Sequence, residues 1–125
     1  MSRIRRANTK PELLLRSSLH AQGVRYRTHV ASLPGCPDVV FARARVVVFV
    51  DGDFWHGWMF PKWSRKLAPY WRNKIAGNRA RDRRNHRRLR RLGWTVVRIW
   101  EHEIEDDLGE CVRRVLGAIR PRTAS

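Results

Sequence analysis

A valine-rich run that ends in acidic residues is followed at once by aromatic side chains and a histidine. Residues 46–58 have the sequence VVVFVDGDFWHGW, and β-branched and aromatic residues in such a run predict a buried strand. Carboxylates beside a core strand are costly to bury unless something pairs with them. His56, five residues after Asp51, could accept a proton from water near neutral pH. A lone histidine beside tryptophans is as often a packing or surface residue, so both interpretations stay open.

A second carboxylate, Asp38, begins a short apolar segment. Taken alone, it is best interpreted as an aspartate that caps the preceding loop. A hairpin that turns at residues 43–44 changes this, because opposed residue numbers then sum to about 87 and Asp38 falls opposite Phe49. Asp38 then lies diagonal to Val50 and Asp51, at one edge of the sheet. Oxygen ligands from such a pair, completed by water and a phosphate, are those that Mg²⁺ prefers.

Asp82 lies within a predicted helix over residues 70–92. It shares a seven-residue stripe with Ile75 and Leu89, with Leu92 alongside, and this spacing predicts that it faces the core. One interpretation is a buried ion pair with an arginine of the same helix. The other is that Asp82 holds the loop histidine or a metal-bound water in place.

The same helix carries a dense run of arginines. Residues 79–91, RARDRRNHRRLRR, contain eight arginines in thirteen positions. A solvated face is the alternative, but no interspersed glutamates relieve the repulsion. We therefore expect phosphate contacts, which position a protein on DNA without specifying sequence.

Aromatic residues of the loop before this helix offer a second kind of contact. Phe54, Trp55, Trp58 and Trp63 lie in a segment too polar and glycine-rich for an ordinary core element. Beside a basic surface, such residues can stack on bases or wedge between steps of duplex DNA. The alternative is that they form a small core beneath a long loop, and the two interpretations can hold for different residues of the group.

The overall charge indicates a polyanionic partner. Twenty-seven lysines and arginines against eleven acids give a net charge of +16 and a pI near 11.7. No long apolar run is present, and the basic residues are not confined to one face of a single amphipathic helix, so nucleic acid is favoured over a membrane. Cys36 and Cys111 are too few for a disulfide framework and form no CxxC knuckle. The N-terminus lacks the apolar stretch of a secretory signal, so we expect a reducing cytoplasm.

The order of predicted elements is α-β-β-β-α-β-α, an α/β sandwich around a mixed sheet. A single domain over residues 1–125 is expected, with mobile ends at 1–8 and 120–125. Thr9 caps the first helix, which has Glu12 three residues after the cap and stops at Gly23. The other predicted elements are strands over 24–28, 38–41, 45–50 and 94–100 and helices over 70–92 and 103–119.

In combination these segments resemble one nuclease family. The segments that match, in the family's order from about residue 3 to residue 104, are TKPELLLRSSLHAQGVRYR, LPGCPDVVF, VVFVDGDFWHG, YWRNKIAGNRARDRRNHRRLRRLGW and VVRIWEHEI. The chain resembles the very-short-patch (Vsr) mismatch repair endonucleases, a branch of the PD-(D/E)xK nucleases. The resemblance covers about four-fifths of the chain, and it implies a restriction-endonuclease-like fold.

What the resemblance implies for the metal is specific. Asp38 corresponds to the aspartate that binds Mg²⁺, for which Mn²⁺ can substitute. Val50 stands where the family usually has threonine and offers its backbone carbonyl as a ligand. Glu12 corresponds to the glutamate that organises the water shell of a second metal. Asp51 replaces a histidine of the best-known member, which alters proton handling or adds a ligand.

The resemblance also implies the base and the DNA contacts. His56 corresponds to the general base and Asp82 to a supporting carboxylate. The side chains expected to contact DNA are Phe54, Trp55, Trp58, Lys74, Arg79, Arg81, Arg83 and Arg84, with the first two forming the wedge beside the mismatch.

A structural zinc of the best-known member is not expected here. Its Cys and His ligand positions correspond to Asp53, Trp58, a residue near Phe60, and His102. One aspartate and one histidine without a thiolate do not make a closed tetrahedral site. We expect packing by Trp58 and its neighbours to fill that space.

The expected function is therefore Mg²⁺-dependent nicking of duplex DNA at T:G mismatches in very-short-patch repair. The alternatives are a restriction-like or defence nuclease with another DNA specificity and a DNA-binding module without catalysis. The expected partner is double-stranded DNA, with mismatch-repair proteins as candidate partners and no membrane. We expect a monomer in the bacterial cytoplasm, associated with the nucleoid.

Overall fold

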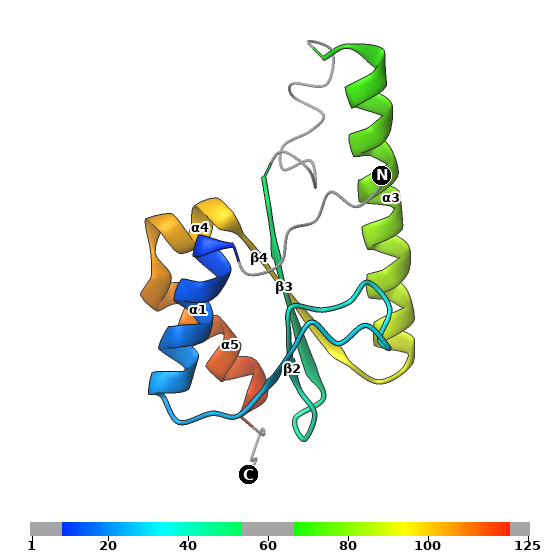
Figure 1. The fold of residues 1–125 in the computed structure, drawn as a ribbon. Coiled ribbons are helices and arrows are strands. Elements are labelled where there is room, and N and C mark those ends of the chain that lie inside the picture. The colour runs from blue at the N-terminus through cyan, green and yellow to red at the C-terminus, as the bar shows by residue number, and fades with distance from the viewer. Residues whose placement is uncertain (1–8, 54–66, 121–125) are drawn as a thin grey trace.

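The fold is a mixed four-stranded sheet with helices on both faces (Figure 1). It comes from a computed structural model that describes residues 9–53 and 67–120. The elements are α1 (Lys10–Ala21), β1 (Arg27–Thr28), β2 (Val39–Phe41), β3 (Val46–Asp51), α3 (Pro69–Arg91), β4 (Thr95–Trp100), α4 (Glu101–Asp106) and α5 (Leu108–Ile119). Helices α1, α4 and α5 cover one face of the sheet, and α3 covers the other. The predicted restriction-endonuclease-like α/β class is confirmed.

The sheet has the order β1-β2-β3-β4, and its last pair is parallel. Strands β2 and β3 pair antiparallel through Val39↔Val48 and Phe41↔Val46, which is the predicted register. The connection from β3 to β4 runs through α3, as a crossover between parallel strands requires. The hairpin therefore brings the start of β2 beside the end of β3, where the expected site residues lie.

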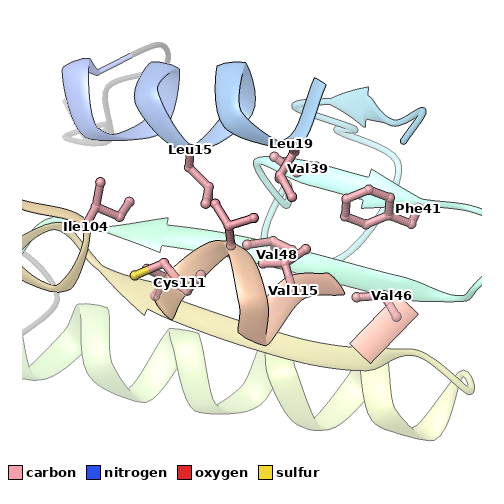
Figure 2. Packing of buried hydrophobic residues seen from close by; sticks show 11 residues of the cluster. Leu15, Leu19, Val39, Phe41, Val46, Val48, Ile104, Cys111 and Val115 are labelled. Carbon is pink, nitrogen blue, oxygen red and sulfur yellow. The ribbon is translucent and has the colours of Figure 1, made fainter. Parts of the chain in front are cut away.

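Strands β2 and β3 are buried on both faces, which explains their unbroken apolar sequence. One core lies between the sheet and helices α1 and α5, and it includes Leu15, Leu19, Val48 and Val115 (Figure 2). A smaller core joins the opposite face of the sheet to α3 through Leu89. Each large side chain buried in this way contributes about 1.5–3 kcal/mol.

Three predictions differ from the structure, two for elements and one for a residue. The last helix is not continuous over 103–119, because Asp107 leaves the helical conformation and its Oδ1 accepts a hydrogen bond from the Glu110 backbone N–H, capping α5. The first strand shrinks to two residues, although the alternation of half-buried and exposed side chains over 24–28 is present. Leu92 is exposed rather than aligned with the core stripe, because α3 ends at Arg91. Across 9–53 and 67–120, none of the helices has the length and apolarity needed to cross a bilayer.

Candidate active site

Glu12 is buried at the start of α1. Thr9 caps the helix as predicted, with its Oγ1 3.4 Å from the Glu12 backbone nitrogen, and Pro11 lies in the first turn. Glu12 as a whole residue is only 1 % exposed. Its Oε2 accepts a hydrogen bond from Arg16 at 3.2 Å and lies 2.6 Å from His29 Nε2. The capping turn thus fixes a carboxylate inside the protein rather than at the surface.

Asp38 is equally buried, at the end of the loop that leads into β2. Its backbone N–H donates to the Val48 carbonyl at 3.0 Å, which ties the residue just before β2 to β3. Its Oδ2 accepts a hydrogen bond from the Val50 backbone N–H at 2.7 Å. Its Oδ1 lies 3.9 Å from His29 Nε2. The predicted meeting of Asp38 with the main chain at the end of β3 is therefore present.

His29 joins these two acids, and sequence reasoning did not identify it. It follows β1, and if the alternation of half-buried Val24, Tyr26 and Thr28 with exposed residues continued, His29 would be expected to face outward. Strand β1 ends at Thr28, however, and His29 adopts a left-handed backbone with φ of 48°. The alternation then no longer fixes the direction of its side chain. Histidine is among the residues enriched in this conformation, so the sequence carried only a weak signal.

Glu12, His29 and Asp38 form a group that could hold a metal ion. One potential ligand atom from each residue lies within 4.8 Å of the other two. Two buried carboxylates this close repel each other unless a cation lies between them. Carboxylate oxygens with one imidazole nitrogen suit a divalent ion. The donor set therefore fits the kind of cofactor that the sequence led us to expect.

Asp51 and Asp82 are joined by one arginine of β4. Arg98, in β4, donates from Nε to Asp51 Oδ2 at 2.7 Å and from its NH2 group to Asp82 Oδ2 at 2.9 Å. Its guanidinium also lies over the Trp100 ring, 4.3 Å from the centroid. The ion pair considered for Asp82 is thus present, but its arginine belongs to β4 and not to α3. Asp82 faces the sheet, whereas most arginines of α3 face solvent.

The exposed face of α3 is strongly basic. We call this surface the α3 arginine face; its exposed members are Arg81, Arg83, Arg84, Arg87, Arg88, Arg90 and Arg91. Lys74 and Arg79, which were also expected to contact DNA, are half-buried rather than exposed. Arginine presents a planar fork of donors that matches phosphate oxygens. A surface of this kind suits the backbone of a nucleic acid.

Known proteins resemble the chain over most of its length. A sequence model described as DNA mismatch endonuclease Vsr matches residues 1–62. A type II nicking enzyme of Xanthomonas oryzae pv. oryzae is 42 % identical over 97 % of this chain and 90 % of its own length. A type II nicking enzyme of Neisseria meningitidis serogroup C is 38 % identical over 91 % of this chain and 79 % of its own. The DNA mismatch endonuclease Vsr of Escherichia coli is 41 % identical over 81 % of this chain and 66 % of its own.

The chain belongs to the Vsr endonuclease family. It is accordingly a DNA endonuclease, a hydrolase, and the catalytically inactive alternative is set aside. The basic α3 face and the acidic group are the features that such an enzyme needs.

Asp53 and His102, two residues that the Vsr resemblance singled out, contact each other. Asp53 Oδ1 lies 2.9 Å from His102 Nδ1, and this hydrogen bond raises the pKa of His102. Both residues are at positions that the sequence resemblance aligned with zinc ligands of the best-known member. In this Vsr-family enzyme they contact each other directly. The absence of zinc remains a prediction.

The expected base and wedge of this Vsr-family endonuclease lie outside the described residues. These are His56 as the base and Phe54 and Trp55 as the wedge; Trp58, a further expected DNA contact, also lies within 54–66. A second histidine, His86, is described and lies against Phe49, with ring centroids 4.7 Å apart. Burial lowers the pKa of His86, and the nearby Arg98 lowers it further. A buried neutral imidazole packed on a ring is best explained as part of the interface between α3 and the sheet.

Proposed function

We propose that this endonuclease nicks one strand of duplex DNA at T:G mismatches, in a reaction that requires a divalent metal. The observation that carries the proposal is the convergence of two buried carboxylates, Glu12 and Asp38, at the sheet edge of a Vsr-family chain. Burying two acids so close together has no structural benefit that an apolar pair would not supply better. A cation-binding role explains why they are there.

Asp38 and the Val50 carbonyl would hold Mg²⁺, with Mn²⁺ as a substitute, and Glu12 lies close enough to Asp38 to bind an ion directly or to order its water shell. The hydrogen bond between Asp38 Oδ2 and the Val50 N–H supports this arrangement, because it holds the carboxylate against the end of β3. When bound, the ion supplies positive charge to the phosphate as negative charge develops on its oxygens. The protein's part is to fix the ligands before DNA arrives.

Proton transfer is assigned to His56, which would accept a proton from the attacking water. Asp82 and Asp51 would act as supporting carboxylates near it. Their shared hydrogen bonds to Arg98 hold both side chains in place and offset their charge. This arrangement favours a positioning role for the two aspartates over direct reaction with the phosphate.

DNA binding is assigned to the α3 arginine face, with Lys74 and Arg79 beside it. Phosphate contacts of this type fix the position of the duplex. Phe54 and Trp55 would wedge into the step beside the mismatch, with Trp58 near them. Opening a base pair costs least at a mismatch, which gives the enzyme a physical basis for choosing T:G.

The test is a nicking assay with Mg²⁺ on two duplexes that differ only in one base pair, T:G or C:G. We expect the T:G duplex to be nicked at least 100-fold faster, which corresponds to about 2.7 kcal/mol. Removal of the metal with a chelator should abolish nicking of both. Equal rates on the two duplexes would contradict the mismatch specificity, and nicking in excess chelator would contradict the metal requirement.

A second candidate is a nicking enzyme with another DNA specificity. It is favoured by the names of relatives, which are type II nicking enzymes in two bacterial genera reported above. The matched duplex of the same assay distinguishes this candidate, because it predicts nicking at a sequence and not at a mispair.

A further inference from the structure

We propose that His29 is a metal ligand in this enzyme, and that the site it forms with Glu12 and Asp38 prefers a divalent transition ion such as Mn²⁺ over Mg²⁺. The inference rests on the proposed metal-dependent function. It goes further by naming a nitrogen ligand and the class of ion that this ligand selects.

The distances among the three side chains suit one small ion. The same nitrogen, His29 Nε2, lies 2.6 Å from Glu12 Oε2 and 3.9 Å from Asp38 Oδ1. Ligands about 2.1 Å from an octahedral ion are separated by about 3 Å when adjacent and about 4.2 Å when opposite. The 3.9 Å separation lies within this range, the 2.6 Å contact would lengthen slightly to admit an ion, and all three ligand atoms lie within 4.8 Å of one another.

His29 is held in place by the same backbone ladder that holds Asp38. Its N–H donates to the Asp38 carbonyl at 3.1 Å, and the next residue, Val30, donates to the Pro37 carbonyl at 3.3 Å. These bonds continue the β1–β2 register of Thr28↔Val39 by two residues. His29 and Asp38 are therefore cross-strand neighbours, and such neighbours lie close enough to act together.

Burial also favours a ligand role for this imidazole. The carboxylates of Glu12 and Asp38 have side chains that are 2 % and 1 % exposed, whereas the His29 side chain is 24 % exposed. The imidazole is therefore the member of the group nearest to solvent. An ion entering from solvent would meet its nitrogen first, with the two buried carboxylates behind it.

The chemistry of the donor set decides between ions. Mg²⁺ takes oxygen ligands and keeps several waters, whereas imidazole suits transition ions. Mn²⁺ accepts both carboxylate and imidazole ligands. We therefore expect a site with one nitrogen among three protein ligands to bind Mn²⁺ more tightly than Mg²⁺.

A purely structural explanation competes with this one. A protonated His29 would itself be a counter-ion for the two acids, in a salt bridge to Glu12 that needs no metal. Arg16 already donates to the same Glu12 oxygen and offsets part of its charge. The two explanations differ in whether the imidazole nitrogen ever bonds to an ion, and this can be measured directly.

The experiment follows Mn²⁺ binding to the full chain without DNA, by the loss of the free-ion signal in electron paramagnetic resonance. Pulsed measurements on the bound ion report nitrogen bonded to it. We expect the wild type to show this nitrogen coupling and His29→Asn to lose it, with Mn²⁺ affinity reduced at least tenfold. Mg²⁺ affinity, measured by competition, should fall less than threefold. His20→Asn, an exposed histidine near the end of α1, is the matched control and should behave as the wild type.

Two further measurements test the inference if His29→Asn folds poorly. Wild type grown with ¹⁵N-histidine should show an altered coupling, and His56→Asn should retain the wild-type coupling. Retained coupling and affinity in His29→Asn, or a coupling lost only in His56→Asn, would overturn this inference and leave the proposed function intact. A folded wild type that binds neither Mn²⁺ nor Mg²⁺ at millimolar concentration would instead overturn the metal-dependent function itself.

Discussion

Replacing Arg98 by methionine should destabilise the fold by about 3 kcal/mol at neutral pH, as breaking a buried ion pair costs about 3–5 kcal/mol. The side chains of Asp51 and Asp82 are 3 % and 16 % exposed, so neither aspartate can regain full hydration in the folded state. The Arg98 side chain is 26 % exposed, which places the cost at the lower end of the range. For a domain of this size, about 3 kcal/mol lowers the Tm by roughly 10 °C.

Urea unfolding of the metal-free protein measures this directly. The double variant Asp51→Asn/Arg98→Met should recover about 1–2 kcal/mol of the loss, because one of the two buried carboxylates that lost the arginine is then neutral. Arg113→Met is the matched control, since Arg113 pairs with Glu110 at an exposed site and should change stability by less than about 0.5 kcal/mol. Wild-type stability in Arg98→Met, or no recovery in the double variant, would refute the reasoning.

The remaining predictions concern pH, a loop glycine and DNA. Because the pKa of His102 is raised, its contact with Asp53 should stabilise the fold fully below about pH 6.5, and this stabilisation should be lost as pH rises through the folded-state pKa. The Tm of Asp53→Asn, measured by thermal unfolding, should lack this pH dependence. Gly35→Ala should cost about 1–3 kcal/mol in urea unfolding, because φ is +79° and the added carbon would lie 3.2 Å from a ring carbon. Arg84→Gln with Arg87→Gln should lower the slope of log affinity against log salt by about 1.8.

Each of these three predictions has a result that would contradict it. A parallel pH dependence in wild type and Asp53→Asn would show that the contact does not titrate as described. Gly117→Ala, in the open part of α5, should instead stabilise by up to about 1 kcal/mol, and equal effects at both glycines would contradict the steric argument. Arg113→Gln is the control for the double arginine variant and should leave the salt slope unchanged. An unchanged slope in the double variant as well would contradict phosphate contacts by the α3 arginine face.

The parts of the fold that sequence could predict are those with a local cause. The turn at residues 43–44 and the apolar runs on either side of it determine the β2–β3 register, and this register brings Asp38 to the end of β3. The cap at Thr9 and the acidic side chain of Glu12 were also readable from their spacing. In each case, neighbouring residues settle the geometry without help from the rest of the chain.

The parts that sequence could not predict depend on distant contacts or on a single backbone angle. His29 reaches the acidic group because its φ is positive, and no periodicity encodes that. Arg98 lies in the strand TVVRIW, where a lone charge signals that a partner must exist. Its partners, however, come from β3 and α3, so only the assembled sheet identifies them. Asp107 illustrates a local ambiguity, since an acid near a helix start can lie inside the first turn or cap it.

The central claim is that a divalent ion held at Asp38 supports cleavage. The most direct test is the single-turnover nicking rate of Asp38→Asn on a T:G duplex, as a function of Mg²⁺ or Mn²⁺ concentration. This exchange keeps the size of the side chain but removes the charge that attracts the ion. We predict a rate at least 1,000-fold below the wild type, about 4 kcal/mol, at every metal concentration. A variant that nicks within tenfold of the wild type at the same metal concentrations would contradict the claim.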